Sequence, residues 1–125
     1  MNENDISYDI RGAAFKVHTA LGPGLLESAY TVALSHELIK MGYEVRTQVG
    51  LPLIYEGIKL EIGYRIDVLV NDLVIIEIKS VDALADVHHK QLLTYLKLSE
   101  KKLGLLINFN VSSLKESIIR IVNNL

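Results

Sequence analysis

The chain has 125 residues, a length typical of one domain, so we expect a single domain over residues 1–125. Half of the residues are hydrophobic and 22% are charged, which excludes a disordered chain, and the lack of cysteine excludes disulfides and thiolate metal sites. The 13 basic and 15 acidic residues argue against tight, sequence-independent DNA binding, but not against a nuclease, because bound metal offsets the charge of acidic ligands.

Apolar residues at helical spacing predict two helices in the first third of the chain. The first covers about residues 6–21 and the second about residues 25–41. The G-P-G segment at residues 22–24 breaks the first helix, and Gly42 is the expected stop of the second. Residues 84–98 carry a further apolar stripe, which predicts a third helix.

Strands are expected between the second and third helices and again after the third. The candidate strands are residues 43–49, 53–55, 58–70, 73–79 and 103–108. Glu56-Gly57 is a hairpin turn signal, and the long candidate would bend at Gly63. The candidate at 73–79 is apolar on both faces, which predicts a buried central strand.

The C-terminal residues 115–122 leave two interpretations open. The run I-I-R-I-V favours a last strand, while L-K-E-S permits a short helical turn before it. The predicted order is therefore α-α-β-β-β-α-β plus a terminal element, which is an α/β arrangement.

The segment from Asp67 to Lys79, D-V-L-V-N-D-L-V-I-I-E-I-K, carries the strongest functional signal. Side chains alternate in a strand, so Glu77 and Lys79 point the same way, and a carboxylate in so apolar a run is costly to bury alone. Two acids and a lysine on adjoining strands can hold a divalent cation and position a water, as metal-dependent phosphodiesterases require. Alternatively, Asp67 is an acid on the exposed face of an edge strand or a partner of Arg65, and Lys79 is a solvated strand end.

The strand register sets a condition on this site. A two-residue loop at Asn71-Asp72 would place Asp67 opposite Ile76, on the other face of the sheet from Glu77. Joint metal binding therefore requires a three-residue loop or a bulge, and bulges are common near active sites.

Three more polar residues lie on predicted helices. Gln91 and Tyr95 are one helical turn apart, where they could hydrogen-bond Lys79 or a phosphate, or form a polar pair at the edge of the core. Glu27 is in the first turn of the second helix. A favourable interaction with the helix dipole is enough to explain an acid at that position.

In order along the chain, these motifs resemble the PD-(D/E)XK nuclease superfamily. The matching set is Asp67, then Glu77-x-Lys79, then Q-x-x-x-Y from Gln91 to Tyr95, which is similar to the exonuclease-like branch. The proline that names the superfamily is absent before Asp67, at a position that varies in that superfamily.

The N-terminal part adds a second, narrower resemblance. The segment G-L-L-E-S-A-Y, with Gly24, Glu27 and Tyr30, is similar to the signature of the small GxxExxY proteins of the same superfamily. The segments G-Y-R-I-D, I-E-I-K and H-x-x-Q-L-L-T-Y-L also look like that family, so the resemblance covers nearly the whole chain.

The resemblance implies a mixed β-sheet flanked by helices, with a restriction-endonuclease-like αβββαβ core. It implies Asp67, Glu77 and Glu27 as ligands of Mg2+ or Mn2+, hard cations that suit oxygen donors, and Lys79 as the residue that orients or activates water. The candidate catalytic residues are Glu27, Asp67, Glu77, Lys79, Gln91 and Tyr95.

Three functions from different classes follow. The leading hypothesis is a metal-dependent nuclease acting on DNA, with RNA as the other substrate. The alternative is a nucleic-acid-binding or regulatory module with weak or no catalysis on the same fold. The third is a structural protein, which the complete acid-acid-lysine set argues against. The oligomeric state is open, with a homodimer as one option.

The lack of recognisable targeting signals indicates where in the cell the protein is expected. No apolar run approaches the length of a membrane-spanning helix, and the first residues lack the basic start and apolar stretch of a signal peptide. We therefore expect a cytoplasmic protein without a membrane partner.

Overall fold

The computed structural model describes residues 2–60 and 63–125. Its elements in chain order are α1 (Glu3–Leu21), α2 (Glu27–Lys40), β1 (Val45–Gly50), β2 (Leu53–Tyr55), β3 (Ile58–Leu60), β4 (Arg65–Val70), β5 (Val74–Lys79), α3 (Asp86–Ser99), β6 (Leu103–Asn108), the 3-10 helix η1 (Leu114–Glu116) and β7 (Ile118–Val122). Five strands form one sheet in the order β1-β4-β5-β6-β7. Only the β5–β6 pair of that sheet is parallel within the described residues, so the sheet is mixed.

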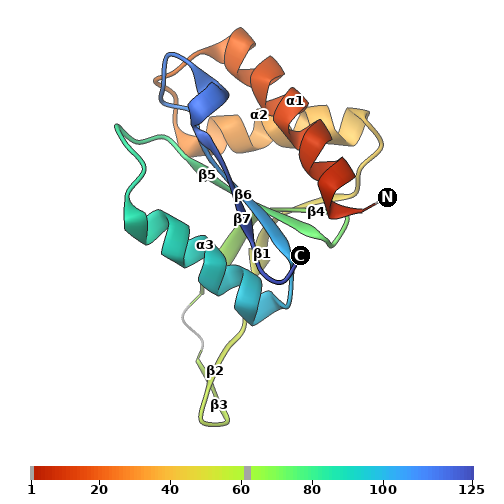
Figure 1. Ribbon diagram of the computed structural model, residues 1–125, viewed down its shortest axis with the longest axis vertical. Helices are drawn as coiled ribbons and strands as arrows, with labels where there is room; N and C mark the ends of the chain where they lie inside the picture. The colour runs from red at the N-terminus through yellow and green to blue at the C-terminus, as the bar shows by residue number, and fades with distance from the viewer. Residues whose placement is uncertain (1, 61–62) are drawn as a thin grey trace.

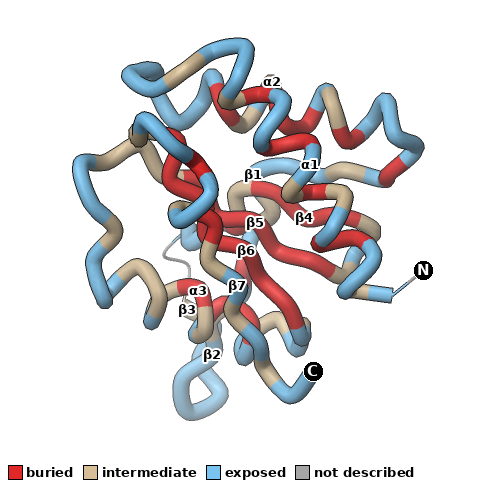
Figure 2. Tube along the Cα trace, turned by 45° about the horizontal axis from the view of Figure 1, so that its top comes forward, coloured by how far each residue is buried: buried red, intermediate tan, exposed pale blue. Residues whose placement is uncertain are grey.

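Helices cover both faces of this sheet (Figure 1). Apolar residues of α1 and α2 pack with alternate residues of β4, β5 and β6, such as Val68 and Ile76, on one face. Leu92 and Leu96 of α3 pack with Ile75 on the other face. Figure 2 shows that the central strands between these layers are almost wholly buried. This α/β arrangement confirms the expected fold class and the central position of β5.

Close contact between α3 and the sheet depends on a glycine. A Cβ atom at Gly104 of β6 would lie 2.9 Å from Leu92 Cδ1, too close for an unstrained contact. The missing side chain lets α3 lie directly on the sheet. The closeness of α3 to the sheet determines how far its polar side chains lie from the end of β5.

The predicted strand over residues 58–70 is wrong as one element. It is two strands in different sheets, because β3 pairs with β2 while β4 pairs with β1 and β5. Gly63 lies between them with φ 76°, and residues 61–62, also part of that prediction, lie outside the described residues. The hairpin signal at Glu56-Gly57 is confirmed, since β2 and β3 form a hairpin that extends away from the main sheet (Figure 1).

The C-terminal alternatives are resolved as a short helical turn, η1, followed by the edge strand β7. The first helix starts earlier than predicted, at Glu3, because Asn2 caps it. Asn2 Oδ1 accepts from the Asp5 amide at 2.9 Å, and the Asp5 carboxylate accepts from the Asn2 amide at 3.3 Å. None of the described helices is long and apolar enough to span a bilayer.

Candidate active site

The turn between β4 and β5 fixes the register of the site. Val70 pairs with Val74, so residues 71–73 form a three-residue turn. Asn71 and Asp72 both adopt positive φ, 51° and 55°, which Asn and Asp tolerate better than most residues. The two-residue loop is therefore excluded, and the three-residue alternative is confirmed.

This register places the two strand acids opposite each other. Val68 pairs with Ile76, and one step further along the strands Asp67 stands across from Glu77. The Asp67 amide donates to Glu77 Oε2 at 2.9 Å, and the Ile78 amide donates to Asp67 Oδ2 at 2.9 Å. The two carboxylates thus replace ladder hydrogen bonds where the β4–β5 pairing ends, and each is held by the other strand's backbone.

Burial makes this pair electrostatically unusual. Glu77 is only 4% exposed, and its burial, reinforced by the charge of Asp67, raises its pKa to about 8. Burial also raises the pKa of Asp67, although the Ile78 amide and the Lys79 charge oppose the rise. A bound cation would relieve the repulsion between two such acids.

Glu27 reaches the same region from the first turn of α2. The Ser80 amide, directly after Lys79, donates to Glu27 Oε2 at 3.2 Å. The Glu27 charge contributes to the raised pKa values of both Asp67 and Glu77. Glu27 and Asp67 also line a common hollow of about 480 Å3. The first turn of α2 therefore lies beside the strand acids, with Glu27 itself exposed to solvent.

A buried tyrosine holds Glu27 in this place. The Tyr30 hydroxyl donates to Gly22 O at 2.6 Å and accepts from the Leu25 amide at 3.2 Å, which fixes the loop before α2. Its ring stacks on Phe109, with centroids 4.5 Å apart and planes 7° from parallel. Gly24 has φ 99°, a conformation that favours glycine. The glycine and tyrosine of the G-x-x-E-x-x-Y segment thus shape the start of α2.

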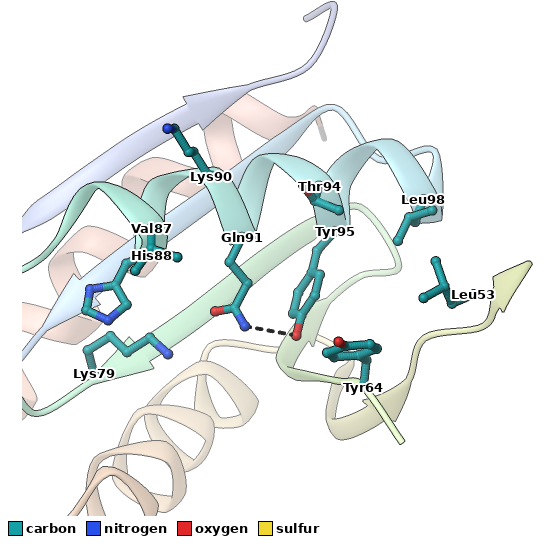
Figure 3. Close-up of a pocket in the computed structure, with 10 residues that line it drawn as sticks. All are labelled: Leu53, Tyr64, Lys79, Val87, His88, Lys90, Gln91, Thr94, Tyr95 and Leu98. Atoms are coloured by element: carbon teal, nitrogen blue, oxygen red, sulfur yellow. Dashed lines mark hydrogen bonds between the residues drawn. The ribbon is translucent and has the colours of Figure 1, made fainter. Parts of the chain in front are cut away.

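The third group of candidate residues lies on the α3 side of the site. Lys79, at the end of β5, lines a cavity together with Gln91 and Tyr95 (Figure 3). Gln91 Nε2 donates to the Tyr95 hydroxyl at 3.3 Å. Burial, followed by the charge of Glu77, raises the pKa of Tyr95. The two α3 residues therefore form a polar pair that faces Lys79. The pair lies close enough to the strand acids for their charge to raise the pKa of Tyr95.

The expected three-acid metal site is not preformed. Among residues 2–60 and 63–125, no group of three or more His, Asp or Glu side chains is arranged to hold a metal ion. Asp67 and Glu77 supply two carboxylates, with Glu27 to one side. This set still fits Mg2+, which retains several waters and often binds one or two carboxylates together with substrate phosphates.

Comparison with protein families covers nearly the whole chain. A family model described as the PD-(D/E)XK nuclease superfamily matches residues 4–121. The chain belongs to this superfamily. Comparisons with curated proteins and with solved structures give no significant match. PD-(D/E)XK membership indicates nuclease activity on nucleic acid, and the superfamily generally uses divalent metals.

Two residues of this PD-(D/E)XK domain lie at the site without having been singled out from the sequence. Gln48 of β1 stands across from Asp67 between the Thr47–Val68 and Val49–Ile66 pairs. It has φ 52° and lines the hollow that holds Glu27. Its side chain is a minor influence that lowers the pKa of Asp67, against the larger effect of burial. A left-handed residue inside a strand leaves no sequence pattern.

Asn108 is the second such residue. It is the last residue of the strand predicted over residues 103–108, and in the structure it ends β6, pairs with Lys79 and is 2% exposed. Its Oδ1 accepts from the Val81 amide at 3.1 Å, and its Nδ2 donates to Val81 O at 2.9 Å. Asn108 therefore fixes the chain that leaves Lys79. An amide at the end of an otherwise apolar strand was the available signal.

Proposed function

We propose that the protein is a divalent-metal-dependent nuclease that hydrolyses phosphodiester bonds, with DNA as the expected substrate. The single observation that carries the proposal is the buried Asp67–Glu77 pair, held across two strands with Lys79 on the next same-side position. Such a pair is costly to keep without a cation. Mg2+ or Mn2+ bound there would polarise the phosphodiester and lower the pKa of an attacking water.

The protein's own residues would take distinct parts. Asp67 and Glu77 would hold the cation as carboxylates, so that Glu77 would release its proton to solvent on binding. Glu27, on the outer side, would add a further carboxylate oxygen to the site. Lys79 orients the attacking water or stabilises charge that develops on the phosphate. Gln91 and Tyr95 orient Lys79 or a phosphate oxygen.

We also propose that the chain is a GxxExxY protein within the superfamily. The support is the arrangement of Gly24, Glu27 and Tyr30, in which the tyrosine and glycine shape the loop that presents the glutamate. A signature whose members share one local structural task is less easily explained by chance than three scattered identities.

A second candidate function is a nucleic-acid-binding or regulatory module with weak or no catalysis. The lack of a three-ligand metal group among the described residues favours it, as does the raised pKa of Glu77, which leaves that acid largely protonated at neutral pH without a cation. Metal-dependent cleavage separates the two candidates.

The test is cleavage of single- and double-stranded DNA and RNA with Mg2+, Mn2+ or EDTA, by the parent protein and by Glu77→Ala. Glu44→Ala is a matched control, because Glu44 is an exposed glutamate beside the turn at the opposite end of the β4–β5 pair. The nuclease proposal expects cutting that EDTA and Glu77→Ala abolish and Glu44→Ala leaves unchanged. Equal cutting by Glu77→Ala would contradict it, and a parent that binds nucleic acid without cutting would favour the second candidate.

A further inference from the structure

A cavity of about 580 Å3 extends from Lys79 along α3 toward the β2–β3 hairpin. Its volume lies within the range of about 300–1,000 Å3 that small-molecule sites occupy. The residues that matter for its chemistry are Leu53, Tyr64, Lys79, Gln91, Tyr95 and Leu98. Lys79 belongs both to the lining of this cavity and to the candidate active site.

The two ends of this cavity differ in chemistry (Figure 3). Lys79 lies at one end, where the site proposed above would hold the scissile phosphate. Tyr64 lies at the other end, with Leu53 and Leu98 nearby, and the Gln91–Tyr95 pair lies between the ends. A cation followed by an apolar, aromatic surface is complementary to a nucleotide, whose phosphate is anionic and whose base is flat and mostly apolar on its faces.

Tyr64 is held in a way that suits a stacking surface. Its ring forms an edge-type pair with Tyr95, with centroids 6.3 Å apart and planes 63° from parallel. Tyr64 nevertheless stays 42% exposed. An aromatic ring that is fixed by a neighbour but still open to solvent loses little conformational entropy when a base stacks on it.

We propose that this cavity binds an unpaired nucleobase stacked on Tyr64, next to the phosphate held at Lys79, which makes single-stranded nucleic acid or an unpaired strand end the substrate. The proposal rests on the nuclease function proposed above. A base inside a duplex has both faces covered by its neighbours, so it cannot enter the cavity without leaving the stack. Stacking is tolerant of base identity, so the cavity predicts strand state rather than sequence preference.

The test measures binding of a labelled single-stranded oligonucleotide by fluorescence anisotropy, in EDTA at low salt so that no cleavage occurs. The probes are one normal strand, one strand of the same length with abasic sites, and one blunt duplex. The variants are Tyr64→Phe, which keeps the ring, Tyr64→Leu, which keeps apolar bulk, and Tyr64→Ala. Tyr8→Ala is the matched control, because Tyr8 is a 79% exposed tyrosine on α1, across the sheet from α3.

Tyr64→Leu and Tyr64→Ala should each weaken binding of the normal strand about tenfold, while Tyr64→Phe and Tyr8→Ala leave it unchanged. The abasic strand should bind the parent about tenfold more weakly than the normal strand and should not respond to Tyr64 variants. Tyr64→Leu guards against misfolding, because it retains packing against Tyr95 and its melting temperature can be compared with that of the parent.

The inference is overturned if Tyr64→Leu binds the normal strand as tightly as the parent. It is also overturned if the parent binds normal and abasic strands equally or binds neither, or if duplex binding depends on Tyr64 to the same degree. These outcomes are separate from those of the cleavage test. A protein that cuts while ignoring Tyr64 contradicts only this inference, and one that binds through Tyr64 without cutting contradicts only the nuclease proposal.

Discussion

Asp67 and Glu77 hold each other in place through the sheet backbone. The Asp67 amide donates to Glu77 Oε2 at 2.9 Å, and the amide after Glu77 donates to Asp67 Oδ2 at the same distance. Neither carboxylate is free to turn outward without losing a backbone hydrogen bond in a buried region. The sheet itself therefore preorganises the two acids, and the folded protein imposes repulsion between them whenever both are ionised.

Stability should fall as pH rises through the range in which Glu77 ionises. Its pKa is about 8 when folded against an ordinary value of 4.5, so the folded state binds more protons than the unfolded state between these pH values. In EDTA, the free energy of unfolding should therefore decrease from about pH 4.5 to about pH 8. Urea unfolding of the parent and of Glu77→Gln measures this, and the variant should show a shallower decrease. Matching slopes in parent and variant, with Glu44→Gln as control, would show that Glu77 ionises normally.

A divalent cation should stabilise the protein by relieving this repulsion. Mg2+ or Mn2+ should raise the melting temperature, and ligand linkage gives about 2.7 kcal/mol at a concentration roughly 100 times the dissociation constant. Because the cation displaces the proton of Glu77, the increase should be larger at pH 8 than at pH 6. Glu77→Ala should abolish it and Glu44→Ala should not. A melting temperature that does not respond to millimolar metal at pH 8 would show that the free protein does not bind the cation. Metal binding would then require the substrate.

Tyr30→Phe should disturb the loop that positions Glu27 while leaving the packing of α2 in place. The variant keeps the ring stacked on Phe109 but removes the hydroxyl that contacts Gly22 O and the Leu25 amide. The loss of these hydrogen bonds should destabilise the protein by about 1–3 kcal/mol. If Glu27 acts in cleavage, Tyr30→Phe and Glu27→Ala should both reduce the rate, but only Tyr30→Phe should lower stability. A Glu27→Ala protein that cuts at the parent rate would leave the helix-dipole explanation sufficient.

Gln48→Gly should make the protein more stable and less active. A non-glycine residue with φ 52° is strained by about 1–3 kcal/mol, and glycine removes this strain at some cost in chain entropy. We expect a net gain of about 0.5–1 kcal/mol in the free energy of unfolding. Cleavage should decrease because the amide that faces Asp67 is lost. If Gln48→Gly is more stable and cuts as fast as the parent, Gln48 has no part in the reaction.

The fold and part of the site could be predicted because they follow from local patterns. Helical spacing and the apolar run around Glu77 were enough to predict α2, α3 and a buried β5 carrying two same-side polar residues. The pairing of Asp67 with Glu77 could not be predicted, because Asn71-Asp72 also suits a two-residue turn. A turn longer by one residue moves Asp67 to the other face of the sheet. Packing on both faces of the sheet determines which turn length forms.

Long-range contacts account for what sequence reasoning missed. Nothing near Gly63 shows that β3 leaves the main sheet, since its partner is β2. Gln48 becomes part of the site only through its place opposite Asp67, and Asn108 only through its contact with Val81. These features depend on strand order and register rather than on periodicity, and the one local signal among them is the amide of Asn108 at the end of an apolar strand.

Lys79→Ala separates catalysis from metal binding when cleavage rate and metal affinity are measured on the same protein. The parent should cut nucleic acid with Mg2+ or Mn2+ and not in EDTA. Lys79→Ala should bind the metal nearly as well, because an ammonium group is not a cation ligand, but should cut about 100-fold more slowly or worse. Lys79→Arg should not restore the full rate, because the guanidinium differs in shape and cannot act as a base. A Lys79→Ala protein that cuts as fast as the parent would show that Lys79 is a solvated strand end without a part in the reaction.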